Sequence, residues 1–119
     1  MPLSRLAQQF ADEIRQHDWS DAPYRADRAG HNRADDARNY PHLPQLAPRE
    51  TDTVRMNVMW VAAQVLGYND PNMDVYEFAE ACGVDTRTPS GHPRSGVITA
   101  GLRKTFNGGY VRPGARDGE

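Results

Sequence analysis

Cationic side chains gather in the last third of the chain, and their types suit contact with phosphate. Residues 84–119 hold 6 Arg or Lys against 3 Asp or Glu, whereas residues 1–83 hold 8 Arg against 13 acids. A net +3 beside a net −5 favours an electropositive end that meets phosphate groups or an acidic protein. The cations concerned are Arg87, Arg94, Arg103, Lys104, Arg112 and Arg116.

Local signals predict a short helix, a reversal and a strand that would present these cations. Ile98, Leu102 and Phe106 recur four residues apart, which is the spacing of an inward-facing helix stripe. The sequence Asn-Gly-Gly at 107–109 permits positive backbone dihedrals and a sharp turn. Residues 110–112 then have the composition of a short strand.

Two further helices are expected before this segment. The apolar run from Val54 to Leu66 predicts a helix that is buried nearly all round and ends at Gly67. Asp74 is placed to cap a second, shorter helix, and Gly83 is placed to end it.

The N-terminal part of the chain divides into a helix and an arm. Leu3, Leu6, Phe10 and Ile14 recur at three- and four-residue steps, which predicts an amphipathic helix ending near residue 17. The next segment, residues 18–48, has no sustained apolar period and contains four prolines, so we expect an irregular arm.

These elements predict a mainly α protein. The N-terminal helix (1–17) and the irregular arm (18–48) precede a helical core (49–119). The core is expected to be a small helical domain with a short C-terminal β-hairpin. The whole chain of 119 residues is long enough to fold as one unit.

The order of elements over residues 52–119 resembles the winged helix-turn-helix family, in the style of MarR-type regulators. Residues 74–84, DVYEFAEACGV, resemble the first helix of the turn motif, with Ala79 and Gly83 at its small-residue positions. Residues 97–119, VITAGLRKTFNGGYVRPGARDGE, resemble a recognition helix followed by a wing.

This resemblance implies a DNA-binding regulator without catalytic activity. Its last helix would enter the major groove, with Thr99 and Arg103 toward base edges. Lys104, Arg94 and Arg87 would contact phosphates. Arg112 and Arg116 on the wing would reach the DNA backbone or the minor groove. Paired half-sites would call for a homodimer, and the N-terminal helix is the expected dimer element. The loop 85–96 departs from the family, because such helices are joined by about 3–4 residues.

Protein interaction is the competing interpretation. The overall pI is about 6.1, whereas a dedicated nucleic-acid-binding domain has a pI above about 9. Aromatic residues along the arm, Trp19, Tyr24 and Tyr40, are of the kind that order on a partner surface. A small adaptor or inhibitor that binds no nucleic acid fits these features.

Catalysis, metal binding and cofactor use are not predicted. The 4 histidines are too scattered for ligand spacing, and no glycine-rich phosphate loop follows a strand. Cys82, the only cysteine, falls on an apolar helix face, which is typical of a buried residue. The longest apolar run, Val58 to Ala63, is far shorter than a membrane span, and no signal-peptide pattern is present. We therefore expect a cytoplasmic protein.

Overall fold

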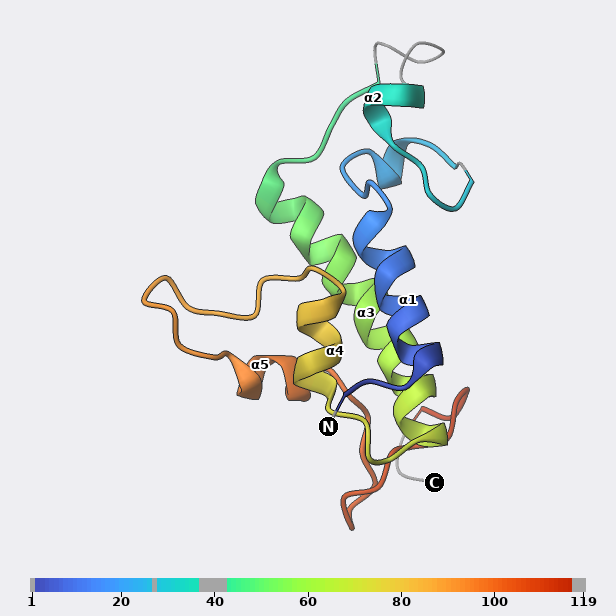
Figure 1. Ribbon diagram of the computed structural model, residues 1–119, viewed down its shortest axis with the longest axis vertical. Coiled ribbons are helices and arrows are strands. Elements are labelled where there is room, and N and C mark those ends of the chain that lie inside the picture. The colour runs from blue at the N-terminus through green and yellow to red at the C-terminus, as the bar shows by residue number, and fades with distance from the viewer. Residues whose placement is uncertain (1, 27, 37–42, 117–119) are drawn as a thin grey trace.

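The computed structural model describes residues 2–26, 28–36 and 43–116. These residues form α1 (Arg5–Gln16), η1 (Ala22–Tyr24), α2 (Arg33–Asp36), α3 (Pro48–Asn69), α4 (Val75–Ala81) and α5 (Ser95–Ala100). Helices α1, α3 and α4 pack against one another, with the arm at one end and the C-terminal segment at the other (Figure 1). No helix in the described ranges is both long enough and apolar enough to cross a bilayer.

The longest helix, α3, supplies the centre of the core. Pro48 occupies its first position, and Glu50 accepts a hydrogen bond from the backbone N–H of Ala47 (2.9 Å), so the start is fixed by two local signals. Its inner face is apolar and buries Met56, Met59, Ala63 and Leu66. Its outer face leaves three apolar side chains exposed, Val61, Val65 and Tyr68. The prediction of a helix buried nearly all round is therefore wrong for this face.

Two glycines lie where an aromatic side chain packs directly on the backbone. A Cβ on Gly67 would lie 2.2 Å from the Tyr110 ring, and one on Gly101 would lie 2.0 Å from the Trp60 indole. Helix α3 runs through Gly67 to Asn69, so the prediction that the helix ends at Gly67 is wrong. Close packing, rather than helix termination, accounts for this glycine.

Helix α4 begins and ends as predicted. The Asp74 carboxylate accepts hydrogen bonds from the N–H groups of Tyr76 (3.0 Å) and Glu77 (3.2 Å). Gly83 follows the helix with φ +84°, a conformation that favours glycine. Cys82 is fully buried in the core, as its helix face predicts.

Helix α1 is also present, but the residues that bury it differ from the predicted stripe. Ser4 caps its start by accepting a hydrogen bond from the N–H of Ala7 (3.1 Å). The buried face consists of Ala7, Ala11 and Ile14. Leu6 and Phe10 are exposed instead. Small alanines let α1 approach α3 and α4 closely, so the helix is rotated away from its larger side chains.

The predicted C-terminal β-hairpin, or wing, is wrong. No strand occurs within residues 2–26, 28–36 and 43–116, and the fold is all-helical with an irregular C-terminal segment. Pairing there is limited to one isolated bridge, between Lys104 and Tyr110. The Gln64 side chain of α3 instead forms hydrogen bonds with backbone groups that a longer strand pair would use.

The last helix, α5, ends at Ala100, so its stripe does not continue to Phe106. Ile98 and Leu102 are buried as predicted. Phe106, at 105% exposure, lies instead in a tight turn in which the Thr105 N–H donates to the Gly109 carbonyl (2.7 Å). The four-residue spacing fails here because the chain leaves the helical path at Gly101.

We predict that Gly101→Ala destabilises the protein by about 1–3 kcal/mol, the usual cost of overpacking. The added methyl group meets the Trp60 indole, which cannot swing away easily because its Nε1 donates to the Ile98 carbonyl (2.7 Å). Urea unfolding followed by circular dichroism measures the change. Gly96→Ala is the matched control, since its Cβ would contact nothing within 4 Å. Equal stability of the two variants would contradict the packing account.

Candidate functional site

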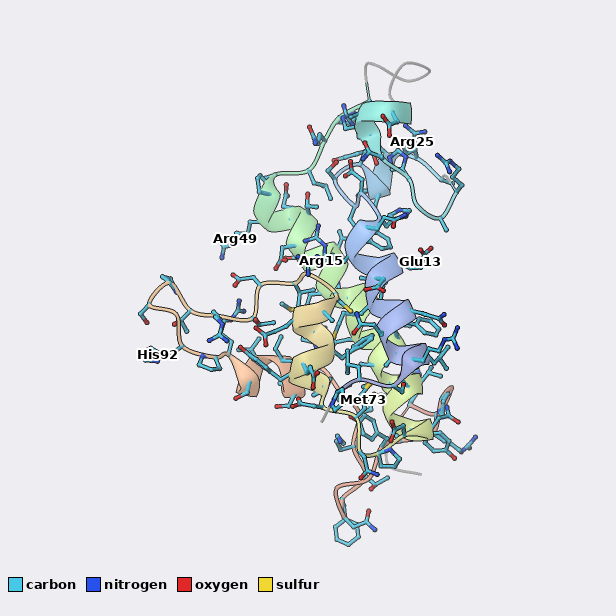
Figure 2. The ribbon with its side chains drawn as sticks, in the orientation of Figure 1. Glu13, Arg15, Arg25, Arg49, Met73 and His92 are labelled. Atoms are coloured by element: carbon cyan, nitrogen blue, oxygen red, sulfur yellow. The ribbon has the colours of Figure 1, made fainter. Side chains whose placement is uncertain are left out.

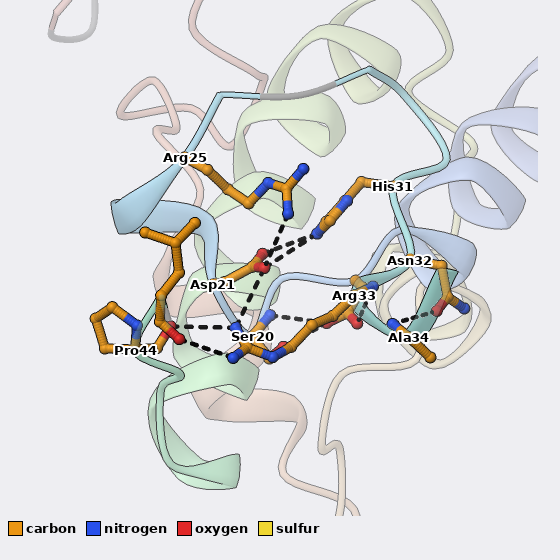
Figure 3. Close-up of polar contacts among 10 residues, drawn as sticks. Ser20, Asp21, Arg25, His31, Asn32, Arg33, Ala34 and Pro44 are labelled. Carbon is orange, nitrogen blue, oxygen red and sulfur yellow. Dashed lines mark hydrogen bonds and ion pairs between the residues drawn. The ribbon is translucent and has the colours of Figure 1, made fainter. Parts of the chain in front are cut away.

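The arm contains a buried polar cluster centred on Asp21, which is 1% exposed. His31, 2% exposed, places Nε2 2.9 Å from Asp21 Oδ1. Arg33 and Arg25 bring guanidinium nitrogens to 3.4 Å and 3.9 Å from the same carboxylate (Figure 3). Within the described residues, no three His, Cys, Asp or Glu side chains gather to hold a metal ion. The cluster joins one carboxylate, one imidazole and two guanidinium groups.

Arg33 ties the two halves of the arm together. Its guanidinium donates to the carbonyls of Leu43 (2.7 Å) and Pro44 (3.2 Å), and the N–H of Leu46 donates to the Ser20 carbonyl (2.6 Å). These polar contacts order the described parts of the arm, where the sequence predicts only irregular structure. Tyr40, one of the expected aromatic anchors, lies outside the described residues.

Asp18, the first residue of the arm, accepts a hydrogen bond from the N–H of Arg33, a member of this cluster. Burial alone would raise its pKa, but hydrogen bonds from the Ser20 hydroxyl (2.6 Å) and from the N–H groups of Arg33 and Ser20, helped by His31, lower it below the usual 3.8. The carboxylate is thus held in its charged form by donors from Ser20 and Arg33.

Cys82 has no features of a nucleophile. Its thiol is enclosed in the core, and burial raises its pKa to about 12.

Two of the cations expected to contact DNA belong to the long loop between α4 and α5, which extends away from the helices (Figure 1), and both form ion pairs within the chain. Arg87 lies 3.6 Å from a carboxylate oxygen of Glu80 and donates to the Gly91 carbonyl (3.0 Å). Arg94 lies 3.4 Å from the Asp85 carboxylate. Figure 2 shows His92 at the outer end of this loop. One ion pair thus ties the loop to α4, and the other joins two residues of the loop itself.

The remaining cations lie apart from this loop, in the C-terminal segment. The ammonium group of Lys104 sits 3.5 Å from the centroid of the Tyr110 ring, a cation–π contact. Arg103 donates through Nε to the Ala115 carbonyl (3.0 Å). Arg112 and Arg116 are exposed further along the same segment. Thr99, on α5, donates its hydroxyl hydrogen to the Ser95 carbonyl (2.9 Å).

One buried side chain fastens the C-terminal segment to α3. The Nε2 group of Gln64 donates to the carbonyls of Arg103 (3.0 Å) and Val111 (2.9 Å), and its Oε1 accepts from the Arg103 N–H (2.8 Å). The Val111 N–H in turn donates to the Arg103 carbonyl (3.0 Å). The carboxamide thereby pairs with backbone groups as a neighbouring strand would, and it holds the chain at Arg103 and at Val111 together.

This attachment creates a groove of about 640 Å³ between α3 and the C-terminal segment. Val61 and Val65 form its apolar side, and Val61 is 72% exposed. Arg103, Pro113 and Arg116 of the C-terminal segment also line the groove. We name this feature the α3 groove. It joins an apolar surface to two cations, and it contains no cluster of groups suited to acid–base or nucleophilic chemistry.

The sequence alone indicates part of the α3 groove. Arg103 and Arg116 are among the predicted site residues, and the structure brings these two together. Val61 and Val65 were expected in the core, and no role for Gln64 was predicted from the sequence. A buried glutamine amid apolar residues is the signal that points to a non-local backbone contact.

We predict that Gln64→Met destabilises the protein by about 2 kcal/mol or more. The substitution leaves the Arg103 N–H and the Val111 carbonyl without partners, and each such buried group costs about 1–3 kcal/mol. Urea unfolding gives the stability, and the rate of tryptic cleavage after Lys104 reports release of the segment. Asn57→Met, on the exposed face of the same helix, is the control. Unchanged stability and cleavage would contradict the fastening role.

We also predict that Asp18→Asn reduces the stability that the protein loses as the pH falls from 7 to about 2. Because the pKa of Asp18 is lowered on folding, its charge contributes fully above about pH 4, and the contribution is lost as pH falls through the folded-state value. Wild type should exceed the variant in stability at pH 7 and approach it by about pH 2. Thermal unfolding across this range provides the measurement. Asp35→Asn, at an exposed carboxylate, is the control. A constant difference at all pH values would contradict the prediction.

Comparison with known proteins adds no relative from which to transfer a function. No protein-family model matches the chain, and no curated protein or solved structure matches it either. The α3 groove is therefore the observation from which a function is inferred.

Proposed function

We propose that this protein is a non-catalytic interaction module whose α3 groove binds an apolar segment of a partner protein that also carries a carboxylate. The observation that carries the proposal is the exposure of Val61 and Val65 on a helix whose other faces form the core. Apolar side chains that share a concave site with a few polar groups are typical of binding surfaces.

The chemistry of the α3 groove favours this occupant. Arg103 is fixed by its Nε hydrogen bond to the Ala115 carbonyl, so its guanidinium is oriented before a partner arrives. Arg116 is exposed near the other end of the same segment. A partner carboxylate would supply acceptors for these cations, and apolar partner side chains would cover Val61 and Val65.

DNA binding through the same end of the molecule is a second candidate, favoured by the four cations within residues 103–116. The helix-turn-helix resemblance stays a prediction for this candidate, without the wing, which the described residues lack. Its support from geometry is smaller, because α5 has 6 residues and both Arg103 and Lys104 lie beyond it. Arg87 and Arg94 are already paired with carboxylates of the chain itself.

A random peptide library displayed on phage tests the proposal with the whole chain as bait. We expect enrichment of peptides that combine acidic and large apolar residues. For a synthetic peptide so selected, Val61→Asp should weaken binding about tenfold or more, because it places a charge in the apolar side of the groove. Arg116→Ala should weaken binding by a smaller factor. Fluorescence polarisation provides the affinities.

Val97→Asp, at an exposed apolar site on α5 outside the α3 groove, is the matched control and should leave binding unchanged. Failure to enrich such peptides, or equal effects of Val61→Asp and Val97→Asp, would contradict the proposal. A random duplex DNA titrated across a salt series tests the second candidate. Steep weakening with salt, reduced by Arg103→Ala with Lys104→Ala, would favour DNA binding instead.

A further inference from the structure

A second exposed apolar surface lies on α1, separate from the α3 groove. Leu6 is 56% exposed and Phe10 is 43% exposed, one helical turn apart. Together with Gln9 and Glu13 they line a shallow depression of about 290 Å³. Large apolar side chains side by side on a surface are typical of an interaction site.

The monomer does not use these side chains for packing. The face of α1 that packs on the core consists of Ala7, Ala11 and Ile14. Leu6 and Phe10 lie on a different face of the helix. Arg15, on another flank, packs beside Gly83 at the end of α4, since a Cβ on that glycine would be 3.1 Å from its side chain. Figure 2 shows Glu13 projecting from α1 on the side opposite Arg15. The surface of Leu6, Phe10 and Glu13 therefore faces away from α4.

We propose that this surface pairs α1 with α1 of a second copy of the chain, in antiparallel orientation. The midpoint of Leu6 and Phe10 is residue 8, and the midpoint of Arg5 and Glu13 is residue 9. A two-fold axis that passes between the two helices, level with residues 8 and 9, thus brings Leu6 of each copy near Phe10 of the other. The same axis brings each Arg5 next to the Glu13 of the second copy, as a self-complementary interface requires.

The charges of α1 favour a second copy as the occupant. Arg5 lies in the first turn and Glu13 lies near the last turn, and no acidic residue occupies the first turn. Both charges oppose the helix dipole, which favours anions at the start and cations at the end. Arg15 is the basic residue of the last turn and suits the dipole, but it lies beside Gly83. In an antiparallel pair, Arg5 and Glu13 each gain an ion-pair partner from the second copy.

Analytical ultracentrifugation from micromolar to millimolar concentration tests the pairing. Wild type should show a concentration-dependent dimer. Arg5→Glu and Glu13→Arg should each weaken it about tenfold, because symmetry converts two attractive pairs into two repulsive ones. An equimolar mixture of the two variants should regain dimers of wild-type strength, since each copy then offers the charge that the other needs.

Arg49→Glu, an exposed charge change at the start of α3, is the matched control and should leave dimerisation unchanged. Leu6→Gln should abolish the dimer while circular dichroism shows an intact helical fold, because the side chain is outside the core. A wild-type monomer at every concentration would overturn the proposal. A dimer insensitive to Leu6→Gln and to the charge variants, or a mixture that fails to regain dimers, would also overturn it.

Discussion

The carboxamide of Gln64 is the interaction on which the C-terminal half of the structure depends. Residues 101–116 contain no helix or strand, so their backbone groups lack the partners that secondary structure provides. Gln64 supplies three hydrogen bonds from one buried side chain and reaches the chain at Arg103 and Val111. With both amide protons and the carbonyl oxygen used, the side chain is almost fully satisfied. An irregular segment thereby acquires a fixed position on α3.

The packing around this contact follows from the same requirement of close approach. Tyr110 lies over Gly67 and Trp60 lies over Gly101, so each aromatic ring meets backbone where any larger residue would clash. These contacts draw the segment against one flank of α3 and leave the next flank, with Val61 and Val65, uncovered. The α3 groove thus lies along the edge of the part of α3 that the C-terminal segment covers. Its apolar side comes from α3 and its cations come from the segment.

The sequence predicted elements whose signals are local. Asp74 and Gly83 bound α4 because capping and a positive φ depend on a few neighbouring residues. The stripe ending at Phe106 was wrong, since periodicity alone does not show that the helix stops at Ala100. The wing was wrong because Gln64, 39 residues before Arg103, takes the place of a strand partner.

Local sequence patterns also fail to predict the contacts within the arm and the lining of the α3 groove. Asp21 and His31 are 10 residues apart, and no local pattern indicates that they meet in a buried cluster. Arg103 and Arg116 were expected to act together, and they do line one groove, although with α3 rather than with a wing. Charge alone identified these cations, but their apolar neighbours depend on how the segment packs, which is a property of the folded chain.

Through-hydrogen-bond couplings in an NMR spectrum of the labelled protein test the role of Gln64 most directly. The account predicts couplings from the Gln64 Nε2 group to the carbonyl carbons of Arg103 and Val111, and slow solvent exchange of both carboxamide protons. Absence of both couplings, with carboxamide exchange as fast as that of the exposed Asn57, would contradict it. In that case neither the position of the C-terminal segment nor the α3 groove would have its physical basis.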